Sequence, residues 1–243
     1  MPRKAATSLH HRAIENLGQR IVDGSLPEGH VMLAEQLETE LNVSRSVIRE
    51  AVRVLQSSGL VETIKRVGIR VLPASFWNPF DPLVIRWRLA SAGRGAQLRS
   101  LAELRTAVEP IAAELAAANA PEQLKQELLD TADELLAVGK SGDAAAALSL
   151  DIRFHALMLA ASGNPMFARL ADQVAETLSG RTSHGLMPEQ IGSQALHLHV
   201  DVAQAIWNGD YQAARTASES IMRQVLHELS PSLADQPRSF GQN

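Results

Sequence analysis

The sequence predicts a mainly α-helical protein in two parts, a small N-terminal domain with one β-hairpin and a larger all-α antiparallel helical bundle. Apolar residues recur at intervals of three and four through most of the 243-residue chain, which is typical of amphipathic helices. This spacing changes once, directly after Gly59, where two short segments resemble β-strands. In the second half, breaks that contain Gly or Pro separate segments of ordinary helix length.

The composition narrows the functional classes. The chain has no cysteine, which excludes disulfides and thiolate metal sites. The N-terminal segment is basic but lacks the apolar core of a secretory signal, and we expect no stretch to be apolar and long enough to span a bilayer. We therefore expect a cytoplasmic protein with no membrane partner. The net charge is −4, yet residues 1–72 hold slightly more basic than acidic side chains, which favours nucleic acid binding there.

Residues 1–74 are predicted to form a winged helix-turn-helix. The expected elements are a helix, a Gly/Pro break, a second helix, a turn, a third helix and two strands, at 9–23, 24–29, 34–41, 42–43, 45–58, 60–64 and 69–72. Ser44 is a suitable N-cap for the third helix, and Gly59 is a suitable stop. Three helices followed by a hairpin with a basic tip, in this order, are typical of a winged helix-turn-helix.

The third helix carries Arg45, Arg49 and Arg53 at a spacing of four, so they form one stripe along it. The face expected to pack on the core consists of Val47, Ala51, Val54 and Leu55. A row of guanidinium groups suits a partner with regularly spaced negative charge, such as double-stranded DNA. The residues that we expect to contact DNA lie on this helix and in the hairpin: Ser44, Arg45, Ser46, Arg49, Arg53, Lys65, Arg66 and Gly68. The alternative, a module that only stabilises its neighbour, would not need basic residues on both elements.

The remainder of the chain reads as a linker followed by helices. Residues 75–97 are expected to form a linker with a short connecting helix at 82–92, and 98–230 an all-helical domain for effector binding and dimerisation. The expected helices of that domain are 98–118, 121–138, 143–161, 165–179, 188–208 and 211–229. Three of them begin near a proline, where the missing N–H costs nothing. The polar tail at 231–243 is expected to be disordered.

Asp151 and His155 are four residues apart, so both project from one face of one helix. Apolar neighbours indicate that this face is buried, and buried polar groups need partners. Of two further histidines, we expect His199 to point inward, because His197 lies about 200° around its helix from the apolar stripe. A carboxylate with imidazoles can begin a metal site. A core hydrogen bond between Asp151 and a histidine, with no ligand, remains an equal alternative.

Arg105 lies one turn before Glu109 on a helix whose other faces are Leu and Ala. An arginine in this position ordinarily forms a salt bridge or faces solvent. An arginine aimed into a polar cavity would instead suit bidentate binding of a carboxylate. The spacing leaves both interpretations open.

Together these segments resemble a known family. "NVSRSVIREAVRVLQSSGLVE" (42–62) is similar to the winged helix of GntR-type bacterial regulators. "DIRFHALMLAASGNP" (151–165) and "HVDVAQAIWNGDYQAAR" (199–215) are similar to the all-helical effector domain, called FCD, of the FadR subgroup. The resemblance spans about residues 8–229, with the motifs in the expected order.

The resemblance implies a homodimeric regulator, most simply a repressor, that binds an inverted-repeat operator and responds to a small carboxylic acid. It implies DNA contacts by Arg45 and Arg49, with the hairpin tip in the minor groove. It also implies a divalent metal such as zinc, manganese or nickel, held by one Asp and three His. Asp151, His155 and His199 match the first three of these ligands.

Two positions depart from the family pattern. The fourth metal ligand falls on Ile221, which cannot coordinate a metal. The wing reads "IKRVG" (64–68) in place of Arg-Pro-Gly-Arg-Gly, so its charge lies at Lys65 and Arg66. A branch of the subgroup that responds to sugar acids such as galactonate also lacks the last histidine. In that branch, Arg105 would bind the carboxylate, and Asp151, His155 and His199 would bind hydroxyls or a weakly held metal.

Three hypotheses for function follow. The favoured one is a transcription factor that is not an enzyme. The second is a metal-assisted hydrolase or lyase that uses Asp151, His155 and His199, since three protein ligands and a water form a legitimate catalytic site. It lacks a separate general acid or base and leaves the winged helix unexplained. The third is a DNA-binding module without an effector, in which the Asp–His cluster is only structural.

Overall fold

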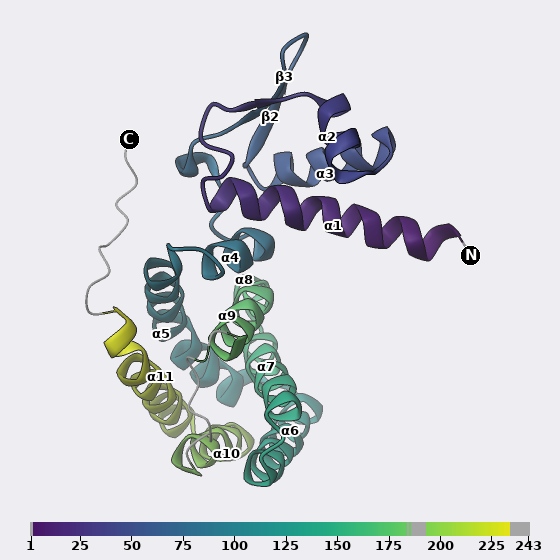
Figure 1. The fold of residues 1–243 in the computed structure, drawn as a ribbon. Helices are drawn as coiled ribbons and strands as arrows, with labels where there is room; N and C mark the ends of the chain where they lie inside the picture. Colours follow the sequence, from purple (N-terminus) through teal and green to yellow (C-terminus); the bar gives the residue numbers. More distant parts are fainter. Residues whose placement is uncertain (1, 184, 186–192, 234–243) are drawn as a thin grey trace. The chain divides into compact units, whose positions relative to one another are not determined.

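The computed structural model describes residues 2–183, 185 and 193–233. It confirms the expected mainly α fold with a small sheet in the N-terminal part (Figure 1). The chain divides into two compact units, of which the first ends at Arg94 and the second begins at Gly95. Each unit is described by itself below.

The first unit contains three helices that pack together and a three-stranded antiparallel sheet. Its helices are α1 (Pro2–Val22), α2 (Ala34–Leu41) and α3 (Arg45–Ser57), and α3 contacts both α1 and α2. The strands are β1 (Val31–Met32), β2 (Val61–Ile64) and β3 (Gly68–Val71), in the order β1-β3-β2. In Figure 1 the β2–β3 hairpin projects from this unit as a wing.

The two-residue strand β1 was not predicted, because two residues carry no alternation. It pairs with β3 through Val31 opposite Arg70 and Met32 opposite Ile69, and so anchors the wing to the start of α2. The predicted apolar face of α3 was partly wrong as well. Ile48 and Val52 are buried with Ala51 and Leu55, whereas Val47 and Val54 are only half-buried. The packing of α3 on α1 and α2 sets this rotation.

The segment expected to be a linker contains a short 3₁₀ helix (Ala74–Phe76) and α4 (Pro82–Leu89), which packs on α1. Asp81 caps α4 by accepting a hydrogen bond from the Leu83 N–H at 2.8 Å. Trp87 belongs to the core of the first unit and donates from Nε1 to Glu15 Oε2 at 2.7 Å. Its ring lies against Gly18, where an added Cβ would come within 2.3 Å of it. The connecting helix is therefore docked on the first helix through a glycine notch.

The second unit consists of helices. Their bounds are α5 (Arg94–Asn119), α6 (Glu122–Ser141), α7 (Ala144–Ala161), α8 (Pro165–Ala168), α9 (Ala171–Ser183), α10 (Ser193–Trp207) and α11 (Tyr211–Leu233). The helix α7 packs against α6, α8 and α9, and α10 packs against α6 and α11 (Figure 1). The helix expected over 165–179 is split into α8 and α9. The helix α11 continues to Leu233, so the expected tail begins later than predicted, and its residues 234–243 lie outside the described part, as do 188–192.

The helix α7 corrects one expectation from composition. Ala144–Ala161 is 18 residues long with a mean hydropathy of 1.4, which is long and apolar enough to cross a membrane. Its position explains the composition differently, because it packs against three other helices and carries the buried polar side chains of Asp151 and His155. An interior helix of a bundle meets the same criterion of length and hydropathy.

We expect Gly18→Ala to destabilise the first unit by about 1–3 kcal/mol, because the new methyl group would overlap the Trp87 ring. The change outweighs the gain in helix propensity, which is about 1 kcal/mol at most. Denaturant unfolding measures the difference. In a Trp87→Leu background the same substitution should be neutral or stabilising. An equal loss in both backgrounds would show that the notch does not matter.

Candidate functional site

The arginine stripe of α3 faces solvent. The side chains of Arg49 and Arg53 are 67% and 65% exposed, and Arg45 is exposed as well. Arg53 Nη1 donates to Glu50 Oε1 at 2.9 Å, and Arg49 Nε lies 3.5 Å from the same oxygen. These ion pairs are solvated and weak, so they do not lock the arginines in place. The three guanidinium groups line one surface groove beside the sheet.

The start of α3 is open to an anion. Ser44 occupies the N-cap position as predicted, but its side chain makes no capping hydrogen bond. Its Oγ instead lies 2.9 Å from Ser46 Oγ. The first N–H groups of α3 therefore lack the usual side-chain acceptor, and such a helix end suits a phosphate oxygen.

The wing presents two basic side chains at its tip. Lys65 and Arg66 are exposed, and Arg66 adopts a left-handed backbone with φ of 65°. Gly68 serves a different purpose from the expected DNA contact. It has φ of 136°, and a Cβ on it would lie 2.6 Å from the carbonyl oxygen of Met32. Gly68 therefore permits the close approach of β1 to the hairpin.

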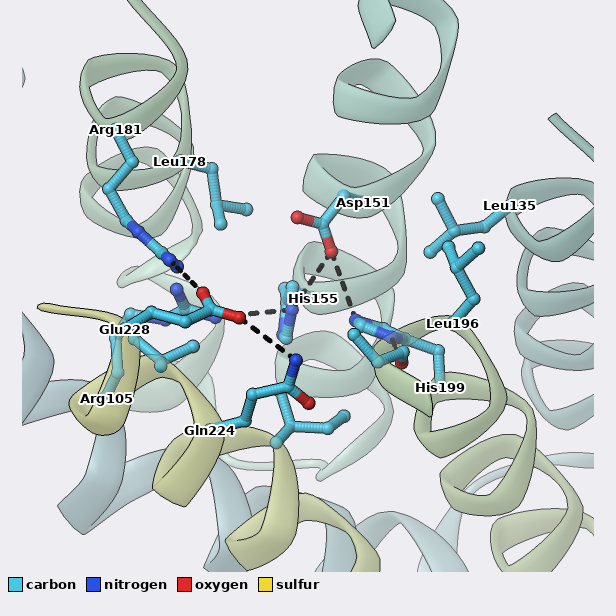
Figure 2. Close-up of a pocket in the computed structure, with 13 residues that line it drawn as sticks. Arg105, Leu135, Asp151, His155, Leu178, Arg181, Leu196, His199, Gln224 and Glu228 are labelled. Carbon is cyan, nitrogen blue, oxygen red and sulfur yellow. Dashed lines mark hydrogen bonds and ion pairs between the residues drawn. The ribbon is translucent and has the colours of Figure 1, made fainter. Parts of the chain in front are cut away.

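The second unit encloses a cavity of about 50 Å³ between its helices. Its apolar walls include Leu135, Leu178 and Ile221. Its polar lining comes from α5, α7, α9, α10 and α11 (Figure 2): Arg105, Asp151, His155, Arg181, His199, Gln224 and Glu228. Four of these were predicted as effector or metal residues, and the fold brings those four together.

Asp151 lies between two histidines. Its Oδ1 atom is 3.3 Å from His155 Nε2 and 3.1 Å from His199 Nε2 (Figure 2). All three side chains are buried, and one ligand atom from each lies within 4.8 Å of the others. The Phe154 ring packs edge-on against both imidazoles, at centroid distances of 5.6 and 5.0 Å, and so holds their orientation. His197 is exposed on the other side of α10.

The donor atoms fit a cation. His199 Nδ1 lies 2.8 Å from the carbonyl oxygen of Ala195, to which it donates its proton. In the neutral ring, the Nε2 lone pair then faces the Asp151 carboxylate, and neither atom has a hydrogen-bond partner among the described residues. Two facing lone pairs repel each other unless a proton or a metal ion lies between them. A carboxylate with two such imidazoles is a suitable set for a divalent ion.

Arg105 is buried, and Glu109 takes up most of its hydrogen-bonding capacity. Its Nε and Nη2 atoms donate to the two oxygens of Glu109 at 2.5 and 3.2 Å, and Nη2 also lies 3.2 Å from His155 Nε2. Arg105 Nη1 has no partner among the described residues. Of the two interpretations of Arg105, the structure thus combines both: it forms a salt bridge and lines the cavity with one free N–H group.

The charges of this cluster balance one another. Burial alone would raise the pKa of Glu109, but the charges of Arg105 and His155 lower it to about 2. Burial would lower the pKa of His155, but the adjacent Glu109 raises it to about 9. The pKa of Asp151 is held well below its usual value, against burial, by His155 and His199. Without a metal, two cations therefore face two carboxylates, and a metal would have to displace the His155 proton.

Three polar residues of the cavity were missed by sequence reasoning. Arg181 on α9 is 2% exposed, and its Nη2 donates to Glu228 Oε2 at 2.7 Å. Gln224 Nε2 donates to the other oxygen of Glu228 at 3.0 Å. Gln224 and Glu228 follow Ile221 by three and seven residues, so helical spacing could have placed them on its face. No sequence signal pointed to Arg181.

Comparison with known proteins agrees with both units. Residues 9–71 match the family of bacterial regulatory proteins called gntR, and residues 100–224 match the FCD domain. An uncharacterised helix-turn-helix regulator of Escherichia coli strain K12, YieP, is 29% identical over 224 residues, covering 90% of this chain and 94% of that protein.

Two solved structures share the fold. The Streptococcus agalactiae protein described as GntR has a TM-score of 0.51 and 24% identity, covering 90% of this chain and 99% of its own. The E. coli protein McbR/YncC has a TM-score of 0.55 and 18% identity, covering 92% and 98%. Because these relatives are regulators, the enzyme alternative is set aside, and the earlier resemblance is confirmed. The chain belongs to the GntR family of transcriptional regulators, with an FCD domain as its C-terminal part.

Proposed function

We propose that this regulator is a homodimeric, cytoplasmic repressor whose operator affinity falls when a small carboxylic acid binds in the FCD domain. A symmetric dimer would read an inverted repeat, since the protein imposes its two-fold symmetry on the DNA. The cavity supports this function most directly. It is enclosed and polar, and it contains buried groups that lack partners, Arg105 Nη1 and the facing Asp151 and His199 atoms. A purely structural cluster would be expected to satisfy them.

The DNA contacts are proposed for the exposed face of α3 and for the wing. Arg45 and Arg49 would reach base edges or phosphates in the major groove, while the start of α3 would receive a phosphate. Arg53 is held toward Glu50 and would serve at the edge of the contact. Lys65 and Arg66 would enter the minor groove, whose negative potential suits cationic side chains.

A divalent metal is proposed as a second ligand of the cavity. Asp151, His155 and His199 would hold it, and it would supply positive charge that attracts an acid or hydroxyl oxygen of the effector. Ile221 is buried and lines the same cavity, so α11 supplies an apolar side chain where the family has an imidazole. We propose weak metal binding for this reason. Sugar acids such as galactonate are the effector class that the resemblance favours, because hydroxyls can bind to the Asp–His cluster.

We expect Arg45→Ala and Arg49→Ala each to weaken operator binding by about 1–3 kcal/mol, because each removes a base or phosphate contact. The salt dependence of binding should also flatten by about one unit per lost phosphate contact. Titration of an operator selected from random duplexes by the wild-type protein measures both. Arg215→Ala, an exposed arginine of the second unit, is the control. Unchanged affinity would remove the substituted arginine from the interface.

Among aldonic and dicarboxylic acids, we expect at least one to raise the melting temperature and to release the operator. A ligand at a hundredfold excess over its Kd stabilises the folded protein by about 2.7 kcal/mol. Thermal shift, repeated with zinc, manganese and nickel, measures the binding, and operator titration measures the release. An acid that strengthens operator binding would contradict the repressor. If no acid binds under any condition, the cluster is structural.

Replacing the missing ligand should strengthen metal binding. We expect Ile221→His to raise zinc or manganese affinity by about tenfold or more, because a third imidazole would enter the cavity beside His199. Ile221→Leu, which keeps the apolar volume, is the matched control. Competition with a chelating dye measures the affinity. Equal affinity in Ile221→His and Ile221→Leu would place the metal elsewhere or exclude it.

A further inference from the structure

Glu228 places a carboxylate inside the cavity that the effector would occupy. It reaches in from α11 and lies between Arg181 on α9 and Gln224 on its own helix (Figure 2). One of its oxygens accepts from Arg181 Nη2 at 2.7 Å, and the other accepts from Gln224 Nε2 at 3.0 Å. Both oxygens are thus bound as an external carboxylate would be. An arginine and an amide together form a complete carboxylate subsite.

The subsite is not saturated by Glu228. Arg181 is 2% exposed, yet its Nε atom has no hydrogen-bond acceptor among the described residues. Glu228 therefore engages only one edge of the guanidinium group. A carboxylate that approached Nε and Nη2 together would make two parallel hydrogen bonds, which is the stronger arrangement. Arg105 cannot offer such a fork, because Glu109 already occupies its Nε and Nη2.

The size of the cavity requires that some lining group moves. About 50 Å³ is room for a few water molecules and not for an organic acid of several carbons. Glu228 is the most mobile choice on physical grounds. Its side chain is 22% exposed, against 2% for Arg181, 10% for Asp151 and 8% for His199. A glutamate can swing its carboxylate to water without breaking a helix, and burial penalises it least.

We propose that Arg181, with Gln224, is the carboxylate anchor of the effector site, and that Glu228 is a resident carboxylate which the effector displaces. The inference rests on the proposed function and adds the residue that recognises the acid. The exchange replaces one buried negative charge by another, so the charge balance around Arg181 is preserved. It also breaks the ion pair that ties α9 to α11, which gives the cavity two distinct arrangements. Uncharged sugars cannot make this exchange, so acids are selected.

Removal of the resident carboxylate tests the proposal. Acetate, succinate and D-galactonate serve as probes, with the full-length protein in calorimetric titrations. We expect Glu228→Gln to bind the acid that binds best at least about tenfold more tightly than the wild type, because the internal competitor has lost its charge. Glu228→Asp keeps the charge but shortens its reach, so its affinity should lie between the two. A residue that only stabilised the fold would lower the affinity when replaced.

Two further variants complete the test. Glu219→Gln on the same helix removes an exposed partner of Arg215 and should leave the affinity unchanged. Arg181→Lys keeps the charge but loses the fork, and should weaken acid binding at least about tenfold. Circular dichroism establishes that each variant is folded. Acid binding to the wild type that neither Glu228→Gln nor Arg181→Lys alters would overturn the inference and leave the proposed function standing. If no probe binds to the wild type or to Glu228→Gln, both fail.

Discussion

The cost of burying charge inside the helical domain constrains everything else in it. A buried ion without a partner costs several kcal/mol, so each charged group must be placed against another. Arg105 and Glu109 on α5 meet His155 on α7, and His155 shares Asp151 with His199 on α10. Because the pairs Arg105–Glu109 and Asp151–His155 are each one turn apart, each helix brings half of its own compensation. The contacts between the helices then fix their register, since a shift of one residue would strand a charge.

The same cluster is incomplete in a particular way, and its incompleteness is what makes a site. The interior of a folded domain ordinarily satisfies its polar atoms. Here Arg105 Nη1, Arg181 Nε and the facing Asp151 and His199 atoms lack partners among the described residues. They all line one cavity, so one ligand could satisfy several of them together. A ligand that does so stabilises one arrangement of the domain, and its effect on DNA binding is bounded by its difference in affinity for the two arrangements.

The fold was largely predictable because its elements follow local rules. The helix at 34–41 was predicted with the bounds that α2 has, and the spacing of Asp151 and His155 correctly indicated one shared buried face. The orientation of α3 was predicted less well, since Val47 and Ile48 are equally apolar and only the neighbouring helices decide which one is buried. The ion pair of Arg181 and Glu228 could not be predicted. It joins residues 47 positions apart, and no local pattern records a contact of that kind.

Ile221 changes how metal and effector would depend on each other in the proposed function. Asp151, His155 and His199 leave more of the coordination sphere open than four protein ligands would, so oxygen atoms of an acid could complete it. A metal held by three ligands also gains more from each added one. We therefore expect metal and acid to bind cooperatively. Thermodynamic reciprocity then requires that the metal raise the affinity for the acid by the same factor by which the acid raises the affinity for the metal. The apolar residue that weakens the metal site would in this way make it respond to the effector.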